Sequence, residues 1–398
     1  MYDIHEYSKR VESARRRLRR LRHSQLLLDF IDHLHALGLS KGRIAKYANH
    51  LCVLFRACPF DPRRATRKTV ERIVAWIERQ PYKASTKDDY KLSLRKIVQY
   101  AKFGSCARGT PIPPEVAWFS VRRRNAKDSR VKPESLLTVE EVRAMMAAAE
   151  NERDRAMISV LFEGGLRPGE LLSMTVGSVA FNSQYCLITV TGKTGVKRIP
   201  LVASFKPLLE WLQKHPLRGE INAPLWISLS NSSKNKRVSY HYLRKLIKKV
   251  AEKAGLRKDV WPYLFRHTTL TNMAKVLTEA RLEQFAGWVH GSRMTARYVH
   301  FSARDLEDAM LELHGIKGKD ENGGVLKATV CPRCGERNAP DALRCSFCGY
   351  ILDAKLALEA EEKRVERLEE VLKRLERLEQ MVYSFLGEKG GPPQRQQP

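Results

Sequence analysis

The sequence contains no run of about 18 consecutive apolar residues, the length that a membrane-spanning helix needs. Its first ten residues, MYDIHEYSKR, also lack the apolar core of a secretory signal. Cysteine is sparse, and four of the eight cysteines (Cys52, Cys58, Cys106 and Cys186) are scattered along the chain. This distribution favours a reducing compartment over a disulfide framework. We therefore expect a cytoplasmic protein that has no membrane partner.

Acidic residues are scarce relative to basic ones. The chain has 72 Lys and Arg against 44 Asp and Glu, which gives a formal net charge of +28. Such a surplus disfavours a compact state but favours binding to a polyanion, because neutralised phosphates release their condensed counterions. The charge predicts nucleic acid as the partner. A basic surface kept for solubility, or a ribosome-associated protein, is the alternative.

The first hundred residues have the pattern of an all-helical domain. Residues 9–22 form a basic run, which is either a solvated helix face or an arm that contacts phosphates. Apolar residues at helical spacing then predict four helices up to residue 103, so residues 1–103 are interpreted as a DNA-binding domain. Basic residues on the opposite faces are its candidate DNA contacts: Arg43, Lys46, Lys87 and Arg95. Residues 104–135, interrupted by glycine and prolines, predict an extended linker that could pass around a duplex.

A second domain is predicted at residues 136–318. Thr138 and Glu141 have the spacing of a capping box, and most of the domain has helical periodicity. Between residues 186 and 202 the pattern changes to alternation around Thr191–Gly195, which predicts a β-hairpin. The fold class is therefore mainly α with a small antiparallel β-sheet.

This second domain carries residues suited to breaking a phosphodiester without metal. That reaction needs a nucleophile, cations that hold the non-bridging oxygens, and an acid that protonates the leaving oxygen. Arginine binds two phosphate oxygens through its planar fork, and lysine can act as the acid when its surroundings lower its pKa. The candidates in chain order are Arg167 with Glu170 as its support, Lys193 at the hairpin tip, Tyr263, Arg266, Trp288 and Tyr298.

In this order and spacing, the set resembles the catalytic signature of tyrosine recombinases, the phage-type integrases. The resemblance spans roughly residues 25–315 and implies a helical core-binding domain followed by a catalytic domain. It implies that Tyr298 attacks the scissile phosphate to form a 3′-phosphotyrosyl bond, while Arg167 and Arg266 clamp the phosphate oxygens. It further implies that Lys193 is the general acid, that Trp288 replaces a histidine found in many relatives, and that catalysis needs no metal or cofactor.

One position departs from the family pattern. Position 263 is tyrosine where the family more often has histidine, and a phenol is a poor general base near neutral pH. His267 is not expected to substitute, because it follows Arg266 directly and helical neighbours point about 100° apart. Either Tyr263 serves, or Tyr298 loses its proton in another way. Structural alternatives also stand: Arg167 as an ion-pair partner of Glu170, and Trp288 or Tyr298 as packed aromatics.

Two pairs of cysteines lie beyond the catalytic domain. Cys331, Cys334, Cys345 and Cys348 form two C-x2-C pairs separated by ten residues. Four thiolates at this spacing are typical of a structural zinc ion, so residues 328–352 are interpreted as a zinc ribbon without an open coordination position. A redox dithiol pair, or another soft metal such as iron, is the alternative.

The end of the chain predicts a coiled-coil helix over residues 353–387, followed by a disordered tail at 388–398. Its apolar positions have a 3-4 spacing: Val365, Leu368, Leu372, Leu375 and Val382. A helix folded back on the body is the alternative. The zinc ribbon on this catalytic unit resembles integrases of archaeal plasmids and viruses, and the family resemblance implies a tetramer on two DNA sites.

These observations predict a site-specific recombinase or integrase that acts on double-stranded DNA. Two other functions remain open. A type IB topoisomerase would share the nucleophile and arginines but relax DNA without a partner site, and a silent relative would bind DNA specifically without forming a covalent adduct.

Overall fold

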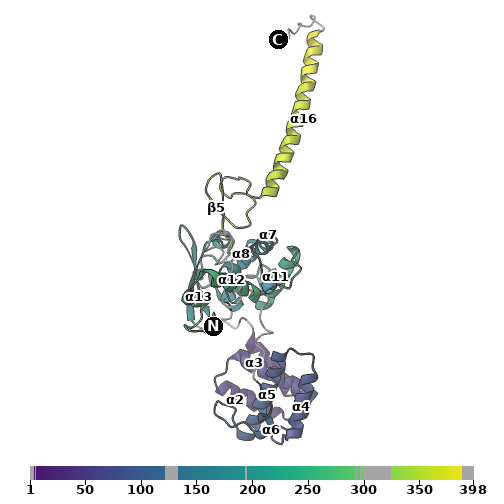
Figure 1. The fold of residues 1–398 in the computed structure, drawn as a ribbon, viewed down its shortest axis with the longest axis vertical. Coiled ribbons are helices and arrows are strands. Elements are labelled where there is room, and N and C mark those ends of the chain that lie inside the picture. The colour runs from purple at the N-terminus through teal and green to yellow at the C-terminus, as the bar shows by residue number, and fades with distance from the viewer. Residues whose placement is uncertain are drawn as a thin grey trace, which may run out of the picture. The chain divides into compact units, whose positions relative to one another are not determined.

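The computed structural model describes residues 6–121, 133–192, 195–292 and 324–387, together with residues 4, 294, 295 and 298, and side chains as far as residue 382. The architecture is mainly helical with small antiparallel sheets, as the sequence predicted (Figure 1). It divides into two compact units, Met1–Ser135 with Ser239–His241, and Leu136–Val238 with Tyr242–Pro398. Among the helices described, none is both long and apolar enough to cross a membrane.

The first unit is a bundle of helices whose apolar faces meet in one core. Its elements are α1 (Tyr7–Leu18), α2 (Ser24–Ala36), α3 (Lys41–Ala57), α4 (Arg67–Arg79), α5 (Ala84–Phe103) and the short α6 (Pro114–Ala117). Phe30 is fully buried at the centre, with its ring beside those of Tyr47 and Tyr100. The basic run predicted at residues 9–22 lies mainly on α1, which buries Val11, Ala14 and Leu18 in this core.

The predicted linker begins later than residue 104. Cys106, Val116 and Phe119 are buried in the core of the first unit. The Gln99 side chain donates hydrogen bonds to the carbonyls of Thr110 (2.8 Å) and Pro111 (2.9 Å), which fixes the chain beside α5. The prolines therefore end regular structure without ending the domain, because side chains of α5 satisfy the exposed carbonyls. Residues 122–132 of the predicted linker lie outside the described residues.

The second unit surrounds a central helix. Its elements are α7 (Val139–Ala147), α8 (Glu152–Glu163), α9 (Pro168–Ser173), β1 (Val179–Phe181), β2 (Cys186–Gly192), β3 (Gly195–Leu201), α10 (Phe205–Lys214), α11 (Tyr240–Lys253), α12 (Pro262–Val276) and α13 (Glu279–Ala286). Helix α8 is apolar on most sides, as expected for a buried helix, and packs against α7, α10 and α12. The capping box at Thr138 and the first-turn Pro168 are confirmed.

The predicted hairpin is formed by β2 and β3, with Gly192 opposite Gly195. Strand β1 pairs with β2 on the other side, giving the antiparallel order β1-β2-β3. This third strand was not predicted, because its three residues are too few to show an alternating pattern.

The C-terminal part contains a two-stranded sheet, β4 (Thr329–Val330) with β5 (Arg337–Asn338), and the uninterrupted helix α16 (Ala354–Gly387), drawn yellow in Figure 1. The apolar positions of α16 lie open to solvent: Val365, Leu368, Leu372, Leu375 and Val382 are 48–57% exposed. These exposures agree with the predicted coiled coil, which remains a prediction.

One buried contact fixes the junction between β3 and α10. The Glu163 carboxylate at the end of α8 accepts hydrogen bonds from the backbone amides of Val202 (2.7 Å), Ala203 (3.0 Å) and Ser204 (2.7 Å). These amides precede α10 and have no partner inside that helix. Burial raises the pKa of the Glu163 carboxyl, although the hydrogen bonds that it accepts act in the opposite direction.

We predict that Glu163→Ala lowers the free energy of unfolding by roughly 3 kcal/mol, because it leaves these buried amides without an acceptor. Glu163→Gln should lose less, since its amide oxygen can still accept. Urea denaturation measures both, with the exposed Glu220→Ala as the matched control. An equal loss in Glu163→Ala and the control would contradict the assignment.

Candidate active site

The site is built around the carboxylate of Glu170. Arg167 is the N-cap of α9, Pro168 occupies the first turn, and Glu170 lies at the third helical position. The backbone amide of Arg167 donates to Glu170 Oε2 (2.9 Å), and its guanidinium Nη1 donates to Oε1 (2.5 Å). Glu170 is 3% exposed. The predicted support of Arg167 by Glu170 is confirmed.

Two further cations reach the same carboxylate from other elements. Lys197 on β3 places Nζ 3.1 Å from Glu170 Oε2, and Arg266 on α12 places Nη1 3.9 Å from the same oxygen. One negative charge therefore lies among the positive charges of Arg167, Lys197 and Arg266. The cluster keeps a surplus of positive charge in a partly buried place, which suits a phosphate anion.

Burial sets the protonation behaviour of this cluster. It lowers the pKa of the Lys197 ammonium to about 8, where the attraction of Glu170 opposes the effect and the positive charge of Arg266 adds to it. It lowers the pKa of Arg266 to about 10, with the charge of Arg167 adding to the effect. Burial alone would raise the pKa of Glu170, but Lys197 and the Arg167 amide, with the two guanidinium groups, hold it below its usual value. Glu170 therefore stays ionised at neutral pH.

Sequence reasoning missed Lys197. On β3, residues 197, 199 and 201 share one face, and Ile199 and Leu201 are buried core residues. A lysine at the third position of such an alternation lies on the buried face, and that signal was available in the sequence. Lys193, the predicted acid, lies outside the described residues, as does Thr194.

The hairpin reaches the cluster at Gly192, the residue before Lys193. A Cβ atom at Gly192 would lie 2.7 Å from Glu170 Oε1 and 3.6 Å from Arg167 Nη1. Only a residue without a side chain permits this approach. The end of β2 thus lies directly against the carboxylate and one of its arginines.

Arg266 connects the turn before α9 to the end of α13. Its Nη1 donates to the carbonyl of Gly165 (2.8 Å) and its Nη2 donates to the carbonyl of Ala286 (2.8 Å). These bonds use two of the five N–H donors of the guanidinium group. The Cζ atom lies 5.8 Å from the centre of the Trp288 ring, within the range of a cation–π contact.

Lys197 also contacts the end of α13. Its Nζ donates to the carbonyl of Phe285 (3.3 Å), and its Cδ would lie 3.1 Å from a Cβ atom at Gly287. Gly287 has a φ of 65°, a conformation that glycine adopts at little cost. The chain can therefore turn sharply before Trp288 and still pack on the lysine.

Tyr298 lies within this assembly and is 4% exposed. It packs with Leu270, Leu282 and Ala286, and its ring stacks on that of Trp288 at 5.4 Å and 25°. Trp288 thus contacts both Arg266 and Tyr298, so the structure brings together Arg167, Arg266, Trp288 and Tyr298 of one chain.

His267, which was not expected to substitute for Tyr263, lies in contact with Tyr298. Its Nδ1 atom lies 3.1 Å from Tyr298 Oη, and the two rings are 6.0 Å apart at 27°. The angle of about 100° between residues 266 and 267 is real, but Tyr298 approaches α12 from the side on which His267 lies. Tyr263 is 41% exposed, and its predicted catalytic role remains a prediction.

Glu283 holds the segment that leads to Tyr298. Its carboxylate accepts hydrogen bonds from the amides of Ser292 (2.9 Å) and Gly291 (3.3 Å) and from the Thr295 hydroxyl (3.2 Å). Glu283 is buried on α13, so these contacts tie the loop to the helix that also meets Arg266 and Lys197.

The candidate DNA contacts of the first unit have different surroundings. Arg43 is exposed on α3. Lys46 forms an ion pair with Asp89 (2.8 Å), and Lys87 forms one with Glu78 (3.6 Å). The positive charge of each lysine is therefore partly balanced by a neighbouring carboxylate. Arg95 donates to the carbonyls of Val116 (3.2 Å) and Phe119, which makes it part of the packing around α6 and a weaker candidate for DNA contact than Arg43.

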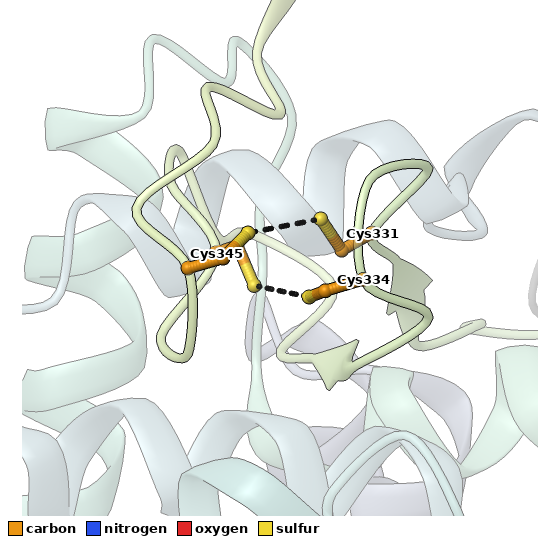
Figure 2. Close-up of side chains that lie close together, drawn as sticks. Cys331, Cys334 and Cys345 are labelled. Carbon is orange, nitrogen blue, oxygen red and sulfur yellow. Dashed lines mark hydrogen bonds between the residues drawn. The ribbon is translucent and has the colours of Figure 1, made fainter.

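The four C-terminal cysteines form a compact site (Figure 2). Their Sγ atoms all lie within 4.8 Å of one another, with Cys331 to Cys348 at 3.6 Å and Cys334 to Cys345 at 3.5 Å. A tetrahedron of Zn–S bonds of about 2.3 Å has S···S edges of about 3.8 Å, whereas a disulfide bond is about 2.05 Å. The site therefore fits one tetrahedral metal ion and not a pair of disulfides.

The two knuckles of this site repeat one backbone pattern. The amide of Cys331 donates to the Glu336 carbonyl (2.9 Å), and that of Cys345 donates to the Tyr350 carbonyl (2.7 Å). In each knuckle the glycine after the second cysteine, with φ near 70°, donates its amide back to the first cysteine carbonyl. Arg155 of α8 fixes the ribbon with two bonds of 2.6 Å to the carboxylate of Asp341.

The fold is that of tyrosine recombinases, and comparison with known proteins agrees. Residues 135–304 match the phage integrase family. This part of the chain therefore carries a domain that matches the phage integrase family.

Individual relatives extend the likeness beyond that domain. The chain is 26% identical over 261 residues to the tyrosine recombinase XerA of Pyrococcus horikoshii, a match that covers 66% of this chain and 84% of the relative. It is also 26% identical over 293 residues to XerA of Pyrococcus furiosus, with 72% and 93% covered.

Solved structures share the fold. The XerH site-specific recombinase in its post-cleavage complex with difH DNA gives a TM-score of 0.54 at 18% identity, over 77% of this chain and 97% of that one. The Tn1549 transposon integrase in complex with transposon right end DNA gives 0.52 at 14% identity, over 72% and 99%.

We predict that Glu170→Ala lowers the free energy of unfolding by about 3 to 5 kcal/mol, because three cations then lose their shared buried counter-ion. Adding Lys197→Met should recover part of this loss, since it removes one uncompensated charge. Chemical denaturation of the two single variants and the double variant measures the coupling energy.

Glu150→Ala is the control for that cycle. Glu150 bridges Lys249 and Lys253 on the surface with a side chain that is 50% exposed, and exposed ion pairs contribute little to stability. Additive effects of Glu170→Ala and Lys197→Met would contradict the proposed coupling.

Proposed function

We propose that this protein is a site-specific DNA recombinase that cleaves and rejoins strands through a 3′-phosphotyrosyl intermediate on Tyr298. The observation that supports this most directly is the convergence of a buried tyrosine and two arginines of one chain on a positive cluster. The named relatives, and the DNA complexes of the two structural neighbours, agree with double-stranded DNA as the partner.

In this reaction Tyr298 Oη attacks phosphorus, the P–O5′ bond breaks, and the leaving oxygen takes up a proton. Arg167 and Arg266 hold the non-bridging oxygens of the phosphate. They use the guanidinium N–H groups that do not bind other parts of the protein. Because Tyr298 lies close to these arginines within one chain, we expect each protomer to cleave DNA with its own tyrosine. Rejoining reverses these bonds and consumes no energy-rich cofactor, since the covalent link keeps the bond energy.

Lys193 is proposed as the general acid. It comes directly after Gly192, where an added Cβ atom would meet Glu170 and Arg167, so the hairpin tip begins at the edge of the cluster. Lys197 would supply a positive charge that raises the affinity of the cluster for phosphate. Tyr263, on the exposed side of α12, would contact the DNA backbone through its hydroxyl.

The C-terminal part is proposed to act in assembly. The exposed seam of α16 would pair with the same helix of other protomers, consistent with a tetramer on two DNA sites. The four cysteines would hold one structural Zn²⁺, and no metal would take part in strand cleavage. A protein with this function acts where the DNA is, which agrees with a cytoplasmic location.

The test of the function is covalent trapping on nicked DNA. Sheared genomic DNA of the source organism is lightly nicked, incubated with wild-type or Tyr298→Phe protein with and without EDTA, denatured in detergent, and the adducts are sequenced. A nick close to the cleavage position lets the short strand diffuse away, so that rejoining fails. Wild type should accumulate adducts at a discrete sequence, and Tyr298→Phe should form none.

The rival functions give different outcomes in the same experiment. Adducts spread over unrelated sequences would indicate a type IB topoisomerase-like activity. A silent DNA-binding protein would bind a specific sequence, but its wild-type form would yield no more covalent adducts than Tyr298→Phe.

For the metal, we predict one zinc per chain in wild type and a loss of most of it in Cys345→Ser, because three thiolates leave the tetrahedron incomplete. Elemental analysis of the purified proteins measures the ratio. Cys58→Ser, which changes a cysteine of the first unit, should keep the full complement. Iron at this ratio in wild type would support the other soft-metal interpretation.

A further inference from the structure

The proposed reaction needs a group that removes the proton from Tyr298, and position 263 does not offer a good one. A phenol near neutral pH ordinarily keeps its own proton, so Tyr263 would be a weak acceptor. Tyr298 is itself 4% exposed, so bulk water has little access to it. The acceptor must therefore come from the protein or from the bound DNA.

His267 is placed for this task. Its Nδ1 atom lies 3.1 Å from Tyr298 Oη, within the range required of a general base. The two rings lie at 27° to each other, with Trp288 also stacked on Tyr298. His267 is only partly buried, so a proton taken up on the ring has a route to solvent.

Helix geometry explains how His267 can serve in place of residue 263. Residues four apart in a helix lie on nearly the same face, one turn from each other. His267 is four residues after Tyr263 on α12, so the imidazole lies one turn further along the same face. His267 therefore contacts Tyr298, the proposed nucleophile, which lies in the segment after Trp288.

The other basic or acidic groups near Tyr298 have different partners. Glu170 accepts from Arg167 and Lys197, and Lys197 also donates to Phe285. Glu283 accepts from the loop amides that precede Tyr298. The Tyr298 hydroxyl, by contrast, lies at hydrogen-bond distance from His267.

We propose that His267 is the general base for Tyr298, an inference that rests on the strand-cleavage function proposed above. With the ring proton on Nε2, the lone pair of Nδ1 takes the hydroxyl proton as the Oη–P bond forms. The P–O5′ bond breaks and the leaving oxygen is protonated by the acid at the hairpin. On rejoining, the 5′ hydroxyl attacks phosphorus, the Oη–P bond breaks, and Nδ1 returns its proton to Tyr298.

The experiment measures single-turnover adduct formation on a synthetic nicked duplex that carries the sequence recovered by covalent trapping, at saturating protein. His267→Ala and His267→Gln should slow cleavage by roughly 10²- to 10⁴-fold, the usual contribution of a general base. The loss should be larger than in Tyr263→Phe, which removes only the hydroxyl at 263. His35→Ala, which changes an exposed histidine of the first unit, is the matched control and should cleave at the wild-type rate.

Two chemical arms separate a base from a residue that only supports the structure. In the first, added imidazole should restore part of the rate in His267→Ala and none in His267→Gln, because only the smaller side chain leaves space for it. In the second, the duplex carries a 5′-bridging sulfur at the cleaved bond, which leaves without being protonated. This substrate should rescue Lys193→Ala but not His267→Ala, since the base acts on the nucleophile.

Several results would overturn the proposal while the function stands. These are a wild-type cleavage rate in His267→Ala, a larger loss in Tyr263→Phe, and rescue of His267→Ala by the sulfur substrate, which would place His267 at the leaving group. A loss in His267→Ala that imidazole cannot restore, with unchanged DNA binding and thermal unfolding, would also count against it. Absence of adducts with wild type would instead contradict the proposed function itself.

Discussion

The carboxylate of Glu170 lies within 3.9 Å of cationic nitrogens from three separate segments of the catalytic unit. Arg167 comes from the turn before α9, Lys197 from β3 and Arg266 from α12. Without a counter-ion, three cations this close in a poorly solvated place would repel one another strongly. One anion allows them to share a small volume and still leaves net positive charge for a phosphate. The start of α9, the hairpin and α12 are therefore fixed relative to one another by the same charge that prepares the site.

A second set of contacts connects this cluster to the segment that carries Tyr298. Arg266 and Lys197 both donate to backbone carbonyls at the end of α13, and Gly287 lets the chain turn there against the lysine. Glu283 then holds the next loop by its amides and hydroxyl. The position of Tyr298 thus depends on carbonyls and amides whose partners lie far away in the sequence. Its contacts with Trp288 and His267 result from that placement.

The conformation of the C-terminal part depends mainly on contacts between residues that are close in the sequence. Each C-x2-C knuckle forms its own backbone hydrogen bonds, and the four sulfurs converge because the two knuckles have the same conformation. The contact between Arg155 and Asp341 is the main charged link of the ribbon to α8. Helix α16 carries its apolar positions at a 3-4 spacing, and among the described residues these positions are exposed.

Features that depend on neighbouring residues could be predicted from the sequence. The capping box at Thr138, the turn at Pro168, the hairpin register and the C-x2-C knuckles are set by spacings of a few residues, and the order of Arg167, Arg266 and Tyr298 marked the chemistry. Three features depended on packing between distant segments. These are the ion pair of Lys197 with Glu170, the packing of Cys106, Val116 and Phe119 in the first unit, and the contact of His267 with Tyr298. Helical periodicity gives the angle between two side chains on α12. Which of these side chains contacts Tyr298 depends on tertiary packing, because Tyr298 comes from a later segment of the chain.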